Sequence, residues 1–341
     1  MRIAIYSLNF APAIGGIETV LSMLAEDFAK LGHEVLLLTQ TRSCAPDALP
    51  YSVVRGATMR DARAAVKWCD LYLMNNVSFY HGLAALCFGK PFAIIHHSLE
   101  PKGRGVQEIK RLLRRTIGSL GRSIAVSRYI AQQLPGSPMV ICNPYDNTMF
   151  RERPEVVRDG DLIFVGRLVK EKGAEVLLEA LAILRNRNLK PRLTIVGDGP
   201  EKTNLAEKAG SLDLCGQVEF SGYRTGEDLA RLLNGHRILV VPSVCEESFG
   251  VVALEGSGCG CVVVASDAGG LKEAVGPCGL TFKSGCANEL AVCLDGLLRN
   301  PARLVEFRSR ATEHLSLHSR EYVAERYLSE FRRIVAGSSQ L

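Results

Sequence analysis

Two short apolar runs, Ile238 to Val241 and Cys261 to Ala265, stand on either side of a segment long enough for one short helix. Runs of this length suit strands that are buried on both faces, and Pro242 ends the first of them. Strand, loop, helix and strand in this order form part of a parallel α/β unit, because parallel strands need a crossover connection. This part of the chain is therefore expected to form an open parallel sheet covered by helices.

The segment between the two runs carries two carboxylates around a predicted helix start. We expect this helix to begin near Phe249 or Gly250, and its first N–H groups lack partners within it. Because they form the positive end of the helix dipole, an anion such as a diphosphate can bind there. Glu247 precedes this end, and Glu255 follows it by about 7 Å at about 1.5 Å per residue. Carboxylates accept hydrogen bonds from sugar hydroxyls, so the stretch fits a nucleotide sugar. Two solvated helix acids are the alternative.

The same alternation of strands and helices runs through both halves of the chain. Between the halves, residues 150–161 are polar and include Pro154 and Gly160, which indicates a linker. We therefore expect two α/β domains, 1–150 and 151–341, with open parallel sheets that face each other across a cleft. The last predicted helix, about 321–336, has an apolar face and is a candidate to cross back onto the first domain.

The composition is that of an ordinary soluble globular protein, with 47% hydrophobic and 23% charged residues in a chain of 341. No apolar run approaches the roughly 20 residues of a membrane span, and residues 1–6 are too few for the core of a signal peptide. The eleven cysteines form no C-x-x-C pair and no cluster with histidine, which disfavours a zinc site. We expect reduced cysteines and a cytoplasmic location.

Positive charge is concentrated in the first half of the chain. Residues 1–150 hold sixteen Lys and Arg against ten Asp and Glu, whereas residues 151–341 hold twenty-five against twenty-six. Seven of the basic residues lie in 102–122, where apolar residues recur at helical spacing. This pattern fits a surface helix packed on its own domain or an amphipathic helix that contacts an anionic membrane. Nucleic acid is disfavoured, because no aromatic residues are interleaved with the charges.

Further candidate residues of the first half follow predicted strands, where ligands bind in open parallel sheets. Gly15 and Gly16 follow the first strand and would let the backbone approach a ligand closely, although a plain strand-to-helix turn is the commoner reason for such glycines. They are not part of a G-x-G-x-x-G fingerprint, so a nicotinamide cofactor is disfavoured. His96 and His97 follow the strand at 91–95. A single such histidine is more often structural, but two adjacent ones favour a site.

In the second half, Arg167 and Lys172 follow the first predicted strand, and residues 170–173 are expected to open the next helix. A guanidinium, an ammonium and a helix N-terminus can together stabilise the negative charge of a departing diphosphate. Solvated loop charges are the alternative interpretation of these two residues. Because these two cations would replace a metal ion at the diphosphate, we expect no carboxylate-held metal ion and no other cofactor.

Several short motifs stand in order along nearly the whole chain. They are Gly15-Gly16-Ile17-Glu18, Gly32-His33-Glu34-Val35, Ile95-His96, Ser127, Gly166 through Gly173, Gly197-Asp198-Gly199-Pro200, Glu247 through Glu255, and Gly269-Gly270 with Glu273. In this order and spacing they resemble the retaining glycosyltransferases of family 4. The resemblance implies the α/β fold called GT-B, in which two Rossmann-like, doubly wound domains face a central cleft. Gly256 departs from the family's usual alanine.

For the second domain, the resemblance implies a binding site for the sugar donor. Glu247, with the backbone at Phe249 and Gly250, would hold the hydroxyls of the transferred sugar. The N–H groups of Val251 and Val252 would bind the diphosphate, and Arg167 and Lys172 would neutralise its charge. Glu255 would bind the ribose, and the backbone near Tyr223 and Arg224 would bind the base.

For the first domain, the resemblance implies that Gly15 and Gly16 approach the diphosphate and that His96 lies near the sugar, a match that His97 lacks. The expected reaction is metal-independent transfer of a hexose-type sugar from a nucleoside diphosphate sugar to a hydroxyl, with retained anomeric configuration. Lipid-linked glycan, polysaccharide or lipopolysaccharide acceptors, and peripheral contact of 102–122 with the inner face of the cell membrane, fit the basic first half. The alternatives are a nucleotide-sugar 2-epimerase of similar fold and an inactive scaffold homologue.

Overall fold

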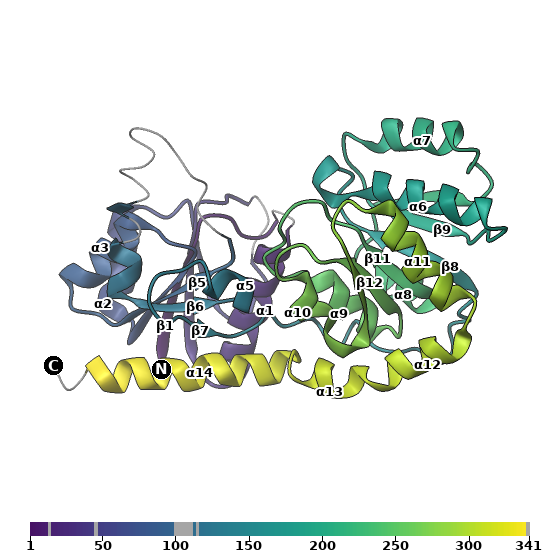
Figure 1. Cartoon of the computed structure of the whole chain (residues 1–341). Coiled ribbons are helices and arrows are strands. Elements are labelled where there is room, and N and C mark those ends of the chain that lie inside the picture. The colour runs from purple at the N-terminus through teal and green to yellow at the C-terminus, as the bar shows by residue number, and fades with distance from the viewer. Residues whose placement is uncertain (13–14, 44–46, 99–111, 114–115, 339–341) are drawn as a thin grey trace. The chain divides into compact units, whose positions relative to one another are not determined.

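The computed structural model describes residues 1–12, 15–43, 47–98, 112–113 and 116–338 (Figure 1). The chain forms two compact units. The first comprises Met1–Pro144 together with Arg320–Leu341, and the second comprises Tyr145–Ser319. Each unit is built on its own parallel sheet, which confirms the expected doubly wound α/β fold class.

The first unit has a seven-stranded sheet in the order β3-β2-β1-β4-β5-β6-β7. All of its paired strands are parallel, and the chain direction across the sheet reverses between β1 and β4. That reversal is the switch point where such sheets bind ligands. The strands are β1 (Arg2–Ser7), β2 (Glu34–Thr39), β3 (Ser52–Arg55), β4 (Leu71–Asn75), β5 (Phe92–His96), β6 (Arg122–Ala125) and β7 (Met139–Val140).

Helices cover this sheet because their apolar residues recur at helical spacing and leave one face to bury. The helices described over their whole length are α1 (Gly16–Lys30), α2 (Met59–Trp68), α3 (Phe79–Cys87) and α5 (Arg128–Ala131), and residues 116–120 are also helical. Ala65 of α2 and Ala85 of α3 join Tyr72 and Ile94 of the strands in one buried cluster. A capping box between Thr58 and Asp61 fixes the start of α2.

The last helix, α14 (Arg320–Ser338), packs against α1 within the first unit. Arg320 donates to both carboxylate oxygens of Asp27, from Nε at 2.9 Å and from Nη2 at 2.7 Å. Phe28 packs edge-on against Phe331, with ring centroids 5.6 Å apart. Both Asp27 and Arg320 are buried. A paired, bidentate contact is the arrangement in which buried charges are tolerated.

The second unit has a six-stranded parallel sheet in the order β10-β9-β8-β11-β12-β13, with its switch point between β8 and β11. The strands are β8 (Gly160–Val165), β9 (Leu193–Val196), β10 (Val218–Gly222), β11 (His236–Val241), β12 (Val262–Ser266) and β13 (Gly279–Phe282). The helices are α6 (Ala174–Asn186), α7 (Lys202–Ser211), α8 (Gly226–Gly235), α9 (Val251–Gly258), α10 (Leu271–Val275), α11 (Ala287–Leu298), α12 (Pro301–Ser309) and α13 (Ala311–Ser316), with single 3₁₀ turns at Lys170–Lys172 and Gly276–Cys278.

Three expectations about local structure were wrong or only partly right. The helix expected to open at Lys170 instead begins at Ala174, after a 3₁₀ turn that ends at Gly173 in the left-handed conformation. The helix expected to begin near Phe249 or Gly250 begins at Val251, with Gly250 as its N-cap. Arg122, assigned to a basic helix, is the first residue of β6 and pairs with Glu330 of α14 at 2.6 Å. Most of the predicted 102–122 helix lies outside the described residues.

None of the helices in the described ranges combines the length and apolar character that a bilayer span requires.

Candidate functional site

The loops that follow β8 and β11 meet at the switch point of the second sheet. The backbone N–H of Val244 donates to the carbonyl of Glu171 at 2.9 Å, which ties the two loops together. Gly173 has φ of +67°, and a Cβ there would lie 1.9 Å from the carbonyl oxygen of Pro242. Only glycine therefore allows this close approach of the two loops.

Lys172, Ser243 and Glu247 form a polar cluster at this junction. Oε1 of Glu247 accepts hydrogen bonds from Nζ of Lys172 at 2.5 Å and from Oγ of Ser243 at 2.7 Å. The side chain of Glu247 retains 18% of its exposure and that of Lys172 29%. Both predicted residues are thus brought into contact, and each still faces solvent.

The backbone of Glu247 is fixed by the glycines that follow β12. Glu247 forms an isolated parallel bridge with Gly269, and its carbonyl accepts from the N–H of Gly270 at 2.7 Å. Gly269 has φ of +64°, and a Cβ there would lie 2.2 Å from the carbonyl oxygen of Glu247. These glycines therefore hold the backbone on which the carboxylate is mounted.

Helix α9 begins directly after this cluster with an open N-terminus. Its N-cap residue, Gly250, has φ of +102°, and no side chain caps the first turn. The N–H groups of Val251 and Val252 lie in that first turn, where a helix offers unpaired donors and a positive dipole end to an anion. The side chain of Phe249 is 2% exposed, so it belongs to the core, and only its backbone is available to a ligand.

Glu255 lies one turn along α9 from this terminus. Burial, reinforced by the charge of Asp146, raises the pKa of Glu255 to about 7. The carboxyl group therefore changes its charge near neutral pH.

Arg167, in the loop after β8, is exposed, and its side chain has no hydrogen-bond or ion-pair partner in the described part of the chain. The loop itself is held tightly. A Cβ at Gly197 would lie 1.9 Å from the carbonyl oxygen of Gly166, and Leu168 N–H donates to the carbonyl of Asp198 at 2.9 Å. The guanidinium thus extends from a fixed backbone and is available to an anion.

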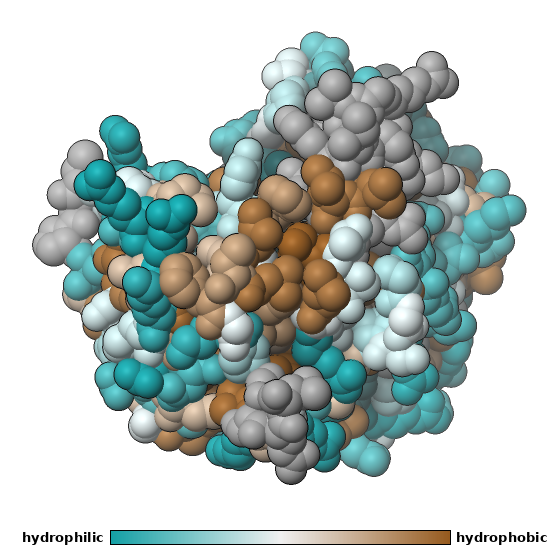
Figure 2. Space-filling view, turned by 90° about the vertical axis from the view of Figure 1, so that its left-hand side faces the viewer, coloured by the Kyte–Doolittle hydropathy of each residue, from teal (hydrophilic) through white to brown (hydrophobic). Residues whose placement is uncertain are grey.

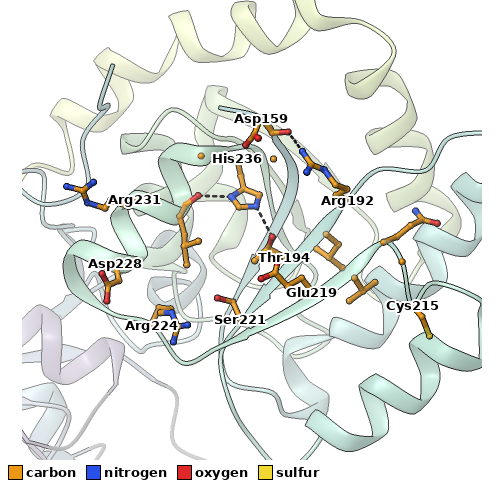
Figure 3. A pocket seen from close by; sticks show the side chains of 17 residues that line it. Asp159, Arg192, Thr194, Cys215, Glu219, Ser221, Arg224, Asp228, Arg231 and His236 are labelled. Atoms are coloured by element: carbon orange, nitrogen blue, oxygen red, sulfur yellow. Dashed lines mark hydrogen bonds between the residues drawn. The ribbon is translucent and has the colours of Figure 1, made fainter. Parts of the chain in front are cut away.

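Arg224 faces a cavity that does not include Lys172 or Glu247. This cavity, of about 940 Å³, lies beside α8 and the strands that carry Thr194 and Glu219 (Figure 3). The ring of His236 spans part of its wall and bonds to Oγ1 of Thr194 at 2.9 Å. The side chain of Arg224 donates to the carbonyl of Tyr223 at 3.1 Å.

In the first unit, Gly15 and Gly16 form the start of α1. Gly15 is the N-cap, in an extended conformation, and its carbonyl accepts from the N–H of Thr19 at 3.1 Å. A Cβ at Gly15 would lie 2.3 Å from Oε2 of Glu18, whereas one at Gly16 would meet nothing within 4 Å. The carboxylate of Glu18 therefore lies against Gly15 at this terminus.

The two adjacent histidines at the end of β5 differ in their hydrogen bonding. Nε2 of His96 bonds to Oγ of Ser123 at 3.1 Å, whereas the buried Nε2 of His97 has no partner among the described residues. Burial lowers the pKa of His96 to about 4, and burial together with His96 lowers the pKa of His97 to about 3. Both rings are neutral at pH 7, and the unpaired nitrogen belongs to His97.

Asn75 is a second polar group at this edge that sequence reasoning did not single out as a site residue. Its Nδ2 donates to Oγ of Ser7 at 2.9 Å, and its buried Oδ1 has no partner in the described ranges. Its neighbour Asn76 accepts the backbone N–H of His97 at 3.0 Å. The signal was the pair of asparagines at the carboxyl end of β4. The corresponding missed signal in the second unit was Ser243, directly after Pro242.

Within the residues that the structure describes, no three His, Cys, Asp or Glu side chains are grouped so that they could hold a metal ion. The site of the second unit offers an ammonium, a guanidinium and helix N–H groups where an anion would bind.

Sequence comparison places both units among known families. The model described as Glycosyltransferase Family 4 matches residues 14–148, and the model described as Glycosyl transferases group 1 matches residues 146–314. The chain is 38% identical over 180 residues to the D-inositol 3-phosphate glycosyltransferase of Rhodococcus erythropolis, a match that covers 50% of this chain and 40% of that protein.

The protein of the same name from Frankia alni is 34% identical over 250 residues, which cover 63% of this chain and 61% of that protein. The chain thus spans about half the length of these curated relatives.

Solved structures share the fold. The structure of Anabaena HepE in complex with UDP superposes with a TM-score of 0.83 at 20% identity, covering 98% of this chain and 100% of that one. The sucrose-phosphate synthase of Thermosynechococcus elongatus gives 0.79 at 23% identity, covering 98% and 99%. These neighbours confirm the two-domain GT-B architecture.

Proposed function

Because the chain belongs to the group 1, family 4 glycosyltransferases, we propose that it transfers a hexose-type sugar from a nucleoside diphosphate sugar to a hydroxyl group. The observation that carries this proposal is the contact of Lys172 with Glu247 beside the open N-terminus of α9. A carboxylate for sugar hydroxyls, cations for the diphosphate and unpaired N–H groups lie together at one sheet edge.

Each candidate group at the site of the second unit has one role in this proposal. Glu247 accepts hydrogen bonds from hydroxyls of the transferred sugar, and Ser243 keeps its carboxylate in place. The N–H groups of Val251 and Val252 bind the diphosphate, with the backbone of Phe249 and Gly250 alongside. Glu255 accepts from the ribose hydroxyls, and the backbone at Tyr223 and Arg224 receives the base.

The proposed reaction retains the configuration at the anomeric carbon. The bond from that carbon to the diphosphate oxygen breaks, and the bond to the acceptor oxygen forms on the same face of the sugar. The proton of the acceptor hydroxyl passes to the departing phosphate oxygen. Arg167 and Lys172 stabilise the charge on this leaving group, so the reaction proceeds without a metal ion or other cofactor.

We assign the acceptor to the carboxyl edge of the first sheet, beside the histidines at the end of β5. Gly15 and Gly16 keep the role that the resemblance implies, which is close approach to the diphosphate of the donor. At the carboxyl edge, Oδ1 of Asn75 and Nε2 of His97 are buried without partners among the described residues. Such groups are costly unless a ligand or water satisfies them, which supports a binding role at this edge. Of the adjacent histidines, His96 was selected by family resemblance, whereas His97 has the unpaired nitrogen.

The acceptor is proposed to be a glycan or lipid-linked molecule of polysaccharide or lipopolysaccharide synthesis. The basic composition of residues 102–122, most of which are outside the described ranges, supports peripheral contact with the cytoplasmic face of an anionic membrane. The curated relatives are named for a phosphorylated cyclitol, so acceptor screens should include inositol phosphate.

The test is a calorimetric screen of nucleoside diphosphate sugars, followed by incubation of each bound donor with and without acceptors. The proposal requires acceptor-dependent release of nucleoside diphosphate and a product with the donor's anomeric configuration. An epimerised donor formed without acceptor would establish the epimerase alternative instead. Failure of every donor to bind would favour an inactive scaffold.

A further inference from the structure

The outer side of α3 in the first unit exposes large apolar side chains to solvent. Tyr80, Leu83 and Leu86 lie three residues apart and therefore on one side of the helix, and Phe88 follows directly after its end. We call these four residues the α3 apolar face. Their exposed fractions are 67%, 43%, 37% and 39%. Helix α3 contains no charged residue that would interrupt the face.

The exposed apolar surface continues into the segment before β6. Residues 116–120 are helical, and Ile117 packs against Gly82, where a Cβ would lie 2.2 Å from Cγ2 of Ile117. This close contact places the segment directly beside α3. The same stretch exposes Leu112, Leu113 and Leu120. Figure 2, which looks onto this end of the first unit, shows hydrophobic side chains gathered into one broad patch.

A row of cations flanks this surface. Arg60, Arg63 and Lys67 lie at helical spacing on the exposed side of α2, which packs against α3. Nζ of Lys67 lies 5.2 Å from the ring centroid of Phe88, so the row and the α3 apolar face are adjacent. None of the three has an acidic partner among the described residues. We call these three residues the α2 basic row.

The combination of exposed apolar and basic side chains indicates which kind of partner binds this surface. A second copy of the chain, related by twofold symmetry, would place one α2 basic row near another and gain nothing for the cations. Nucleic acid would leave the leucines exposed. An anionic bilayer suits both the α3 apolar face and the α2 basic row, because apolar side chains enter the headgroup boundary while Lys and Arg contact lipid phosphates.

We propose that the α3 apolar face, with Leu112, Leu113 and Leu120, inserts into the surface of an anionic bilayer while the α2 basic row contacts its phosphates. This inference deepens the proposed membrane contact by assigning it to α2 and α3 in addition to 102–122. It is tested without any sugar donor, so its failure leaves the transfer reaction untouched.

The first measurement is sedimentation of the protein with vesicles of phosphatidylcholine alone or mixed with phosphatidylglycerol. Binding is expected only with the anionic lipid and should weaken as salt is added. Equal binding to both vesicles, or none, would overturn the proposal.

Two exposed cysteines supply a map of the contact without mutation. Cys87, at the end of α3, and Cys215, in the second unit, are both exposed. Anionic vesicles should slow alkylation of Cys87 severalfold, read by peptide mass spectrometry, and leave the rate at Cys215 unchanged. Equal rates at Cys87 with and without bound vesicles would exclude α3 from the contact.

Variants then separate the two parts of the surface. Leu83→Asp with Leu86→Asp should reduce vesicle binding by about tenfold or more, since two apolar anchors are lost. Val292→Asp with Val305→Asp, at exposed positions of α11 and α12, is the matched control and should bind normally. Charge removal by Arg63→Gln should lower binding about fivefold, with Lys202→Gln as its control.

The competing assignment is that residues 102–111 alone bind the protein to the membrane. Under that assignment, Lys102→Gln with Arg104→Gln would abolish sedimentation, and the α3 variants would bind like the wild-type chain. That pattern would reject the proposal. Thermal unfolding of each variant shows whether the first unit remains folded.

Discussion

Nζ of Lys172 lies 2.5 Å from Oε1 of Glu247, although 75 positions separate these residues in the sequence. The pair is formed because the 3₁₀ turn before Gly173 packs against the end of β11. In the proposed reaction, the cation serves the leaving group and the carboxylate serves the sugar. Their contact in the absence of ligand keeps both at the place where the donor's diphosphate and sugar would meet.

We expect Lys172→Met and Glu247→Gln to lower turnover by about 100-fold or more, the usual effect of removing a group that stabilises transition-state charge. The free energy of unfolding should change by only about 1 kcal/mol, because the pair is partly exposed. Steady-state kinetics and thermal unfolding measure the two effects. Wild-type turnover in both variants would remove this pair from the site.

Glu255 should make donor binding depend on pH around neutrality. Because its pKa is raised to about 7, the carboxylate that accepts ribose hydroxyls is lost as the pH falls below that value. Donor affinity measured by calorimetry should therefore decrease on acidification. Glu255→Gln should bind donor weakly and without this pH dependence, with turnover at saturating donor largely retained. An unchanged pH profile in the variant would assign the titration to another group.

The same residue should have the opposite effect on stability. The folded state holds the Glu255 proton more tightly than the unfolded state, whose carboxyl has the ordinary value of 4.5. The contribution of this group is therefore fully present below pH 4.5 and is lost as the pH rises towards 7, by about 3 kcal/mol at most. Comparison of unfolding curves for the wild type and Glu255→Gln across this range isolates the effect. Parallel curves would contradict it.

Gly269→Ala should impair the site through the backbone. Its left-handed φ and the 2.2 Å approach of a Cβ to the carbonyl of Glu247 leave no room for a side chain. We expect a loss of about 1–3 kcal/mol in stability, as for other strained backbone positions, and a fall in turnover. Gly216→Ala is the control, because a Cβ there meets nothing within 4 Å. Equal behaviour of the two variants would show that the loop has another conformation in solution.

Substitutions of the two adjacent histidines should have different effects on turnover and on stability. His97→Ala is expected to reduce turnover, because it removes the unpaired buried nitrogen. His96→Ala should chiefly lower stability, since it deletes a buried ring that bonds to Ser123. Acceptor KM and thermal unfolding, measured for both variants, distinguish these outcomes. The reverse pattern would favour a catalytic role for His96, which the family resemblance places near the sugar.

The sequence was sufficient for the fold and for the loops that carry the site. Short apolar runs revealed most strands, and the motif from Glu247 to Glu255 marked the open helix terminus now observed at Val251. It could not reveal the turn at Lys170–Lys172, because that conformation depends on contact between Gly173 and Pro242 in the folded unit.

The hydrogen-bond and ion-pair partners of the polar side chains also could not be predicted from the sequence. Ser243 supports Glu247 only because β11 ends beside the loop after β8. Arg122 was assigned to a basic helix, whereas its partner, Glu330, lies 208 positions away. Such contacts depend on how distant elements pack, and helical periodicity or residue type gives no account of them.

The packing of α14 on α1 has a consequence for how the protein is made. A ribosome releases Phe28 and Asp27 early, but their partners Phe331 and Arg320 follow only after the whole second unit has been synthesised. The second unit can therefore complete its core first, although it comes later in the gene. Until the final helix emerges, the side of α1 that carries Asp27 and Phe28 is exposed to water. This is the period in which chaperones would bind the first unit.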